Sequence, residues 1–236
     1  MTRRRWIADE VSGNRAVILG EHARHLAQVL RAKLGQEFDI STGSEVRRGR
    51  ISKVADDRVE FDLGEQVVSS SPSVITVALS IFKFDRMEWA IEKCTELGVA
   101  KLIPVIAGRT ESYLIASAPK RLDRWQRVAH AAAEQSRQLS PPEISAPLKL
   151  GDLISSVQGT RIVLSEIEAQ VALRDAVPDS ASSLTLAFGP EGGWKDDELA
   201  VFAVAGWTSA SLGPTILRAE TAIIAAVAVV SSILQS

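Results

Sequence analysis

The stretch LTLAFGPEGGW, residues Leu184 to Trp194, joins a strand to a glycine-rich turn and a helix start. Its first five residues are apolar with strand spacing, and the Gly-Pro pair at 189–190 ends the run. Gly192 and Gly193 follow, and glycines let a backbone approach a ligand without an intervening Cβ. A strand that ends this way before a helix marks the edge at which an open α/β sheet binds ligands. The stretch therefore predicts a ligand site in an α/β domain.

The acidic residues after the turn argue against a phosphate ligand. Asp196, Asp197 and Glu198 occupy the first helical turn, where they satisfy the helix dipole and repel an anion. The chain contains neither a GxxxxGK[ST] nor a GxGxxG motif. A ligand with hydrogen-bonding groups, an apolar face and little negative charge fits better, and S-adenosylmethionine has these properties. A plain tight turn that requires two glycines stays an open alternative.

The composition indicates a globular protein with one large or two modest domains, since 236 residues are 46% hydrophobic and 24% charged. The single cysteine, Cys94, excludes an internal disulfide and fits a reducing cytosol. His22, His25 and His130 lack partners at metal-site spacing, so we expect no metal. The N-terminus lacks the apolar stretch of a signal peptide, and the most apolar run is too short to span a membrane. We therefore expect a cytoplasmic protein.

Charge is divided unevenly along the chain. Residues 1–58 hold 12 Lys/Arg and 8 Asp/Glu, whereas the remainder holds 15 and 21. A basic part beside an acidic one is expected if the first part contacts a polyanion such as RNA. A solvated charged surface is the alternative. No aromatic platform accompanies the arginines, so base stacking is not indicated.

Residues 1–70 are expected to form a small barrel of short strands with one helix. The patterns predict strands at 3–7, 15–19, 37–40, 46–54 and 58–62 and a helix at 22–32. The serine- and proline-bearing segment Val67–Ser73 marks the domain boundary.

Residues 74–236 alternate between strands and helices, which predicts a mostly parallel sheet with helices on both faces. Strands are expected at 74–82, 100–107, 160–164, 184–188 and 207–212, and helices at 86–97, 119–138, 151–157 and 217–234. Loop residues follow three strand ends, at 165–166, 189–190 and 213–214, and should meet at one edge. The closing helix is alanine-rich and apolar nearly all round, so we expect it to be buried and shared with a partner subunit.

Four motifs in a fixed order resemble the bacterial RsmE family, which comprises 16S ribosomal RNA (uracil N-3) methyltransferases of the SPOUT superfamily. They are DRMEWAIEKCTELGV at 85–99, RWQRVAHAAAEQSRQ at 124–138, FGPEGGW at 188–194 and LGPTILRAETA at 212–222. The likeness covers nearly the whole chain, because RRRW and HARHLAQVLRAKLGQEFDI resemble the family's PUA-like domain.

The resemblance implies a PUA-like RNA-binding domain over 1–70 and a SPOUT methyltransferase domain with a deep trefoil knot over 74–236. It implies a homodimer that uses S-adenosylmethionine to methylate N-3 of one uridine in the decoding region of 16S rRNA. The partner would be 16S rRNA or the 30S subunit, with no membrane and no metal.

The resemblance also assigns cofactor binding to three loops. Their residues are Leu164, Ser165, Glu166, Phe188, Gly189, Pro190, Glu191, Gly192, Gly193, Leu212, Gly213, Ile216, Leu217 and Arg218. One departure is Thr215, which stands where the family usually has a basic residue, although the main-chain loop is intact.

Uracil N-3 carries a proton, so methylation there calls for a general base or for cations that stabilise the uracil oxyanion. Candidate bases are Glu96, Glu134 and Glu191, and candidate cations are Arg86, Arg109, Arg137 and Arg218. We select Arg218 and Glu96 as catalytic and leave the base open, because an ion pair on a helix face also explains Glu96. RNA binding is expected from Arg3, Arg4, Arg5, Arg24, Arg31, Arg86, Arg109, Gln135 and Arg137.

Three other functions stay in view. A related methyltransferase could act at another RNA position. A non-catalytic RNA-binding module is disfavoured by the intact FGPEGG and ILRAETA motifs. A nucleotide-dependent oxidoreductase is disfavoured by the missing phosphate loop.

Overall fold

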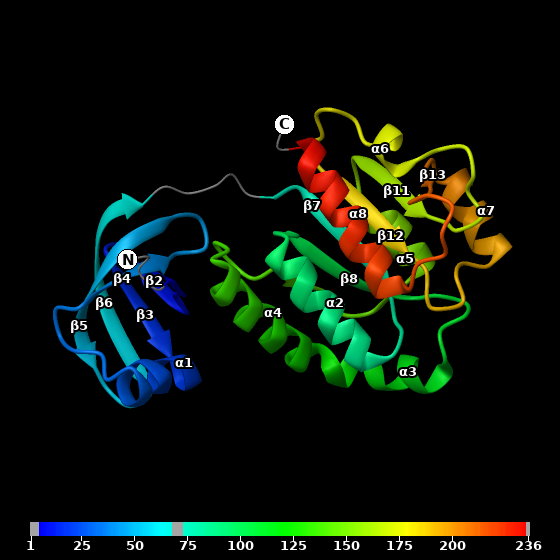
Figure 1. Ribbon diagram of the computed structural model, residues 1–236. Coiled ribbons are helices and arrows are strands. Elements are labelled where there is room, and N and C mark those ends of the chain that lie inside the picture. The colour runs from blue at the N-terminus through cyan, green and yellow to red at the C-terminus, as the bar shows by residue number, and fades with distance from the viewer. Residues whose placement is uncertain (1–4, 68–72, 235–236) are drawn as a thin grey trace. The chain divides into compact units, whose positions relative to one another are not determined.

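The computed structural model describes residues 5–67 and 73–234, and the chain divides into two compact units. The N-terminal unit contains Met1–Pro72 together with Ala133–Ser140, and the C-terminal unit contains Ser73–Ala132 together with Pro141–Ser236. Both units and their elements are drawn in Figure 1. Arg3 and Arg4 lie outside the described residues.

The N-terminal unit is a curled six-stranded sheet with the order β1-β4-β5-β6-β3-β2 (Figure 1). Its strands are β1 (Arg5–Ile7), β2 (Glu10–Ser12), β3 (Arg15–Leu19), β4 (Glu37–Ser41), β5 (Val46–Val54) and β6 (Arg58–Val67). All pairs are antiparallel except β1 with β4. Trp6, Ile18, Leu26, Ile40 and Phe61 belong to its core.

The expected closed barrel is a half-barrel here, because β1 and β2 stay unpaired edges among the described strands. Strand β2, which the sequence did not predict, has three exposed residues, and β1 has three residues in all. Such short edges offer little apolar surface to close a seam, and short exposed edges are a common way for sheets to end.

The single helix expected over 22–32 is two shorter elements. Helix α1 (Gly20–Arg24) runs into a π-helical turn, η1 (His25–Val29). The wide turn is visible in the bond from the Leu30 N–H to the His25 carbonyl, and Arg31 then adopts a left-handed φ of 49°. Helical spacing identified the buried Leu26 correctly but could not reveal the extra residue in the turn.

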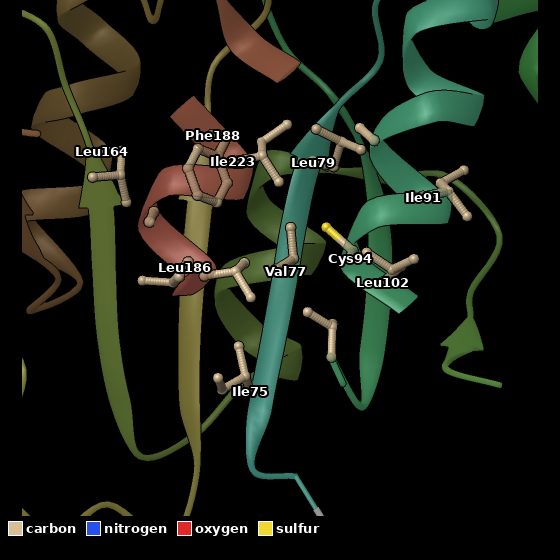
Figure 2. Packing of buried hydrophobic residues seen from close by; sticks show 14 of the residues in the cluster. Ile75, Val77, Leu79, Ile91, Cys94, Leu102, Leu164, Leu186, Phe188 and Ile223 are labelled. Carbon is tan, nitrogen blue, oxygen red and sulfur yellow. The ribbon is translucent and has the colours of Figure 1, made fainter. Parts of the chain in front are cut away.

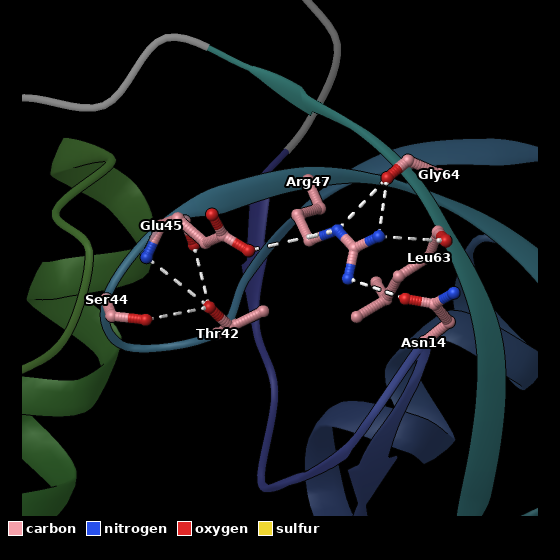
Figure 3. Close-up of polar contacts among 7 residues, drawn as sticks. All are labelled: Asn14, Thr42, Ser44, Glu45, Arg47, Leu63 and Gly64. Atoms are coloured by element: carbon pink, nitrogen blue, oxygen red, sulfur yellow. Dashed lines mark hydrogen bonds and ion pairs between the residues drawn. The ribbon is translucent and has the colours of Figure 1, made fainter.

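The side chain of Arg47 in β5 makes its contacts within the N-terminal unit (Figure 3). Its guanidinium donates to the carbonyls of Gly64 and Leu63 and to the side-chain oxygen of Asn14, and it pairs with Glu45. This arginine fork therefore stabilises the β5–β6 hairpin.

The C-terminal unit is a seven-stranded, fully parallel sheet, as the strand–helix alternation predicted. Its strand order is β10-β8-β7-β12-β11-β13, with β9 also paired to β8. The strands are β7 (Ile75–Ser80), β8 (Lys101–Ile106), β9 (Glu143–Ile144), β10 (Leu148–Lys149), β11 (Thr160–Leu164), β12 (Leu184–Phe188) and β13 (Thr208–Ala210).

Helices cover both faces of this sheet, which confirms the second part of the expectation. Alternate strand residues point to opposite faces, so Val77, Leu79 and Leu186 enter one core (Figure 2) and Ala78 and Ala187 enter the other. The first core packs against α2 (Phe84–Glu96), α4 (Leu122–Ser136) and α8 (Ala219–Leu234), and the second against α5 (Leu150–Ser156) and α7 (Asp196–Val204).

The single helix expected over 119–138 is instead the 3-10 turn η2 (Ala118–Arg121) followed by α4. Several short elements were not predicted: α3 (Ser112–Ser117), α6 (Leu173–Ala176), β9 and β10. Each is shorter than the windows in which hydrophobic periodicity can be read. Among the described helices, none is long and apolar enough to cross a bilayer.

Candidate active site

A cavity of about 850 Å³ lies at the carboxyl edge of the parallel sheet. Strands β11, β12 and β13 are neighbours and parallel, so the loops that follow them leave the sheet at the same edge. These loops contribute Leu164–Gln170, Phe188–Glu191 with Gly193, and Ala210–Ala219 to the lining. The expectation that the three strand ends meet is therefore confirmed.

The glycine-rich turn of the opening stretch forms one wall. The Gly193 N–H donates to the Pro190 carbonyl at 2.8 Å, and Gly193 has a φ of 69° that favours glycine. A Cβ on Gly193 would come within 2.8 Å of Glu166 Oε1, and one on Gly189 within 3.1 Å of the Trp194 nitrogen. Gly189 and Gly193 therefore allow the shape of the turn and its close approach to the loop after β11.

Gly192 differs from its neighbours. It is absent from the cavity lining, and a Cβ there would meet the Arg109 Cδ at 3.3 Å. Its expected cofactor role stays a prediction.

Helix α7 begins at Asp196 with three acidic residues in its first turn, as the sequence predicted. Glu198 is buried, and its two carboxylate oxygens accept from the Lys195 N–H at 2.9 Å and the Gly108 N–H at 2.7 Å. The helix N-terminus is thus satisfied by its own side chains, which disfavours a phosphate there. The same carboxylate ties the loop after β8 to the turn after β12.

The loop after β11 is held beside the segment after β13. The Ser165 N–H donates to the Ala210 carbonyl at 3.0 Å, and Ser211 exchanges backbone bonds with Val171 and Leu173. Backbone N–H groups, first that of Gln170, lower the pKa of Glu168. This loop supplied lining residues that the sequence analysis missed, and its run of polar residues without periodicity was the available signal.

Two arginines contact the glycine-rich turn from other segments. Arg86, in the first turn of α2, donates from Nη1 to Glu191 Oε1 at 2.7 Å. Arg109, after β8, donates to the Gly192 carbonyl. Both line the cavity, and so does the exposed Arg218. The catalytic role expected for Arg218 stays a prediction.

The remaining expected residues lie elsewhere. Glu96, at the end of α2, pairs with Lys93 at 2.7 Å and is not among the lining residues. Gln135 and Arg137 belong to the segment grouped with the N-terminal unit, where the Arg137 carbonyl accepts from Arg5. Burial lowers the pKa of Arg5. The cavity lining also includes Thr215, so the departure from the family pattern is part of this wall.

The sequence matches the RNA methyltransferase domain over residues 69–231. The chain is 32% identical to a protein named ribosomal RNA small subunit methyltransferase E from Synechocystis sp., over 90% of this chain and 71% of that one. It is 33% identical to the protein of that name from Mycobacterium tuberculosis, over 89% and 84% of the two chains.

Solved structures agree with these sequence matches. The crystal structure of ribosomal RNA small subunit methyltransferase E from Neisseria gonorrhoeae, bound to S-adenosyl methionine, has a TM-score of 0.86 at 28% identity and 98% coverage of both chains. A putative methyltransferase from Legionella pneumophila in complex with the same cofactor has a TM-score of 0.85 at 27% identity and 98% coverage of both chains.

Proposed function

The chain belongs to the ribosomal RNA small subunit methyltransferase E family, and we propose from this premise how its two units divide the reaction. The protein is an S-adenosylmethionine-dependent enzyme that methylates RNA of the small ribosomal subunit. The cavity at the carboxyl edge of the parallel sheet carries the proposal, because it is the site into which the three loops expected to hold the cofactor project.

Within that cavity, the cofactor is held by the three loops, with their main chain and apolar side chains on its adenosine part. S-Adenosylmethionine supplies the methyl group as a sulfonium, and alignment of donor and acceptor accounts for much of the rate of such a displacement. Gly189 and Gly193 keep the turn close enough to the ligand, and Arg218 lies beside the same loop. Thr215 contributes a hydroxyl to the cavity wall, at the position where the family resemblance leads us to expect a basic residue.

The methyl acceptor is N-3 of one uridine in 16S RNA, and residues 1–70 hold that RNA while residues 74–236 perform the transfer. Exposed Arg24 and Arg31 on the N-terminal unit support this division, since arginine forks suit phosphate oxygens. A substrate of this kind places the protein with the ribosomes in the cytoplasm. Neither a membrane nor a metal takes part in this mechanism.

A knotted C-terminal segment and a homodimer complete the proposal. The knot is proposed from family membership, and the bridge between Ala172 and Ser211 holds the end of β13 beside the loop after β11, within the segment that would form the knot. Helix α8 supports the dimer, since this largely apolar helix leaves the apolar residues Ala228 and Val229 exposed. A crystal structure traced through residues 164–222 tests the knot, and sedimentation of the protein and of Val229→Glu tests the dimer.

Mapping modified uridines in 16S RNA from a strain that lacks this gene tests the substrate. We expect one N-3-methyluridine to be lost and to return when the purified protein and S-adenosylmethionine are added to 30S subunits. If the N-3-methyluridine returns in free 16S RNA but not in 30S subunits, the substrate is the RNA before the subunit is assembled. A methyl group at another nucleotide would assign the related RNA methyltransferase activity. Calorimetry with S-adenosylmethionine and with NAD distinguishes the cofactor.

A further inference from the structure

Three segments far apart in the sequence place one arginine between two glutamates at the cavity. Arg86 of α2 donates to Glu191 at 2.7 Å, and its Nε lies 3.9 Å from Oε1 of Glu220, in the first turn of α8. Arg86 and Glu191 line the cavity, whereas Glu220 is not among the lining residues. The guanidinium of Arg86 therefore has a carboxylate from each of two other segments within 4 Å.

Glu220 is the buried member of this cluster. The residue is 9% exposed, and its Oε2 has no hydrogen-bond partner among the described residues. Burial of a carboxylate is costly unless a charge or hydrogen bonds compensate. Arg86 is the cation within 4 Å of this carboxylate, so Glu220 can influence how the Arg86 guanidinium is oriented.

Arg86 keeps unused donors. A guanidinium has five N–H groups, and within residues 5–67 and 73–234 the bond to Glu191 is the hydrogen bond that Arg86 makes. Two carboxylates within 4 Å leave the cluster net negative, which disfavours a full anion such as a phosphate or a carboxylate. A neutral carbonyl oxygen is the ligand that these remaining donors suit.

The Arg86–Glu191 pair thus offers a donor next to an acceptor. The imide edge of uracil has the complementary order, since a carbonyl oxygen flanks the N3–H group on either side. Cytosine instead presents an unprotonated N3 beside an amino group, so its N3 would face the Glu191 carboxylate and its amino group the Arg86 donors. The pair therefore matches uracil and rejects cytosine.

We propose that Arg86 and Glu191 recognise the imide edge of the target uracil and that Glu191 accepts the N3 proton, with Glu220 as the residue that positions Arg86. The inference rests on the proposed function. The S–CH3 bond breaks as the N3–CH3 bond forms, which leaves S-adenosylhomocysteine as a neutral thioether. The N3–H electron pair goes to the new bond, and the proton passes to the free oxygen of Glu191 and then to solvent.

This assignment replaces Glu96 as the base. Of the three carboxylates considered from the sequence, Glu191 lines the cavity, whereas Glu96 pairs with Lys93 and Glu134 lies in the segment grouped with the N-terminal unit. The cavity, at about 850 Å³, lies near the upper end of the range for single-ligand sites, so a base fits beside a cofactor.

The test compares two substrates in single-turnover methyl transfer. Small-subunit particles are rebuilt from 16S transcript that carries either uridine or 5-fluorouridine, because fluorine makes the N3–H more acidic and the base less necessary. We expect Glu191→Gln to slow transfer to the ordinary particle by about 10²- to 10⁴-fold, with the Kd of S-adenosylmethionine within about threefold. The defect should shrink at least about tenfold on the fluorinated particle.

A double-mutant cycle tests Glu220. Glu220→Gln is expected to lower kcat about tenfold with KM nearly unchanged, and adding it to Arg86→Gln should cause no further loss, because Glu220 acts through Arg86. Glu88→Gln is the matched control, since Glu88 lies in α2 with Arg86 and pairs with Arg124 of α4 but does not line the cavity. It should behave as the unaltered protein.

Each contrary outcome has a distinct meaning. An equal Glu191→Gln defect on both particles would overturn the base assignment, and Glu191→Asp, which keeps a carboxylate, should retain more activity than Glu191→Gln. Independent losses from Arg86→Gln and Glu220→Gln, or a Glu88→Gln loss as large as that of Glu220→Gln, would overturn the positioning role. If the unaltered protein binds S-adenosylmethionine but never methylates uracil N-3, the proposed function itself fails.

Discussion

The two units of the molecule use arginine in different ways. In the C-terminal unit, Arg86 and Arg109 come from separate segments and fix the turn at 189–193. In the N-terminal unit, the Arg47 and Arg48 side chains bond to their own sheet, whereas the exposed side chains of Arg24 and Arg31 form no hydrogen bond or ion pair with other described residues. The number of basic residues in a unit therefore does not give the number that can bind RNA, because a paired guanidinium has few donors left for phosphate.

The largest expected effect concerns the turn that these cavity arginines hold. Gly193→Val should weaken S-adenosylmethionine binding by at least about 100-fold, because valine strains a φ of 69° and its Cβ would collide with Glu166. Calorimetry measures the Kd, and circular dichroism checks that the fold persists. Gly151→Ala is the control, since a Cβ there meets nothing within 4 Å. Unchanged affinity in Gly193→Val would remove the turn from the cofactor site.

The next effect separates the two kinds of arginine in the N-terminal unit. Arg24→Ala with Arg31→Ala should weaken binding of small-subunit RNA about tenfold and reduce the slope of log K against log salt by about 2. Arg47→Ala with Arg48→Ala should instead lower the free energy of unfolding by about 2 kcal/mol and leave the slope unchanged. Fluorescence anisotropy over a salt series and urea titration provide the two measurements. Equal salt slopes for both double variants would abolish the distinction.

The smallest expected effect is a dependence of stability on pH that arises in the core of the C-terminal unit. Cys94 is the only cysteine in the sequence, so its thiol reports on this unit and not on the N-terminal one. Burial raises the pKa of the Cys94 thiol from 9.0 to about 12. Above pH 9 the unfolded chain loses this proton while the native state keeps it, so the unfolded state binds fewer protons and stability falls as pH rises. The fall should be about 1.4 kcal/mol per pH unit until the native thiol ionises near pH 12.

Cys94→Ala is the comparison for that measurement. The difference between its urea stability and that of the unaltered protein, followed from neutral pH to about pH 10, isolates the thiol from other titrating groups. A difference that does not change with pH would mean that the thiol titrates equally in both states.

Much of the C-terminal unit followed from its sequence. Strands β11 and β12 have the predicted bounds, and the helices α2 and α8 begin and end within two residues of expectation. Long apolar segments with turn residues at their ends leave little choice of secondary structure. The N-terminal unit was less predictable, since β2 has no apolar residue directed into a core and η1 departs from helical periodicity.

The candidate site was likewise predicted in part. The three loops and the glycine-rich turn could be named, because strand ends and glycines are written in the sequence itself. The meeting of Arg86, Glu191 and Glu220 could not, since Arg86 and Glu191 are 105 residues apart and each looks like an ordinary surface charge. For the same reason Glu96 looked as suitable a base as Glu191.

The sequence by itself determined a parallel α/β unit and the loops at its strand ends, because local periodicity and glycine conformation act over short stretches. Tertiary structure decided which charges face the cavity and which are already paired. The fold brings the turn after β12 and the first turn of α8 to Arg86 in the first turn of α2, and burial then gives Glu220 its influence over Arg86. Electrostatic partners depend on distance in space, and no stretch of sequence records that distance.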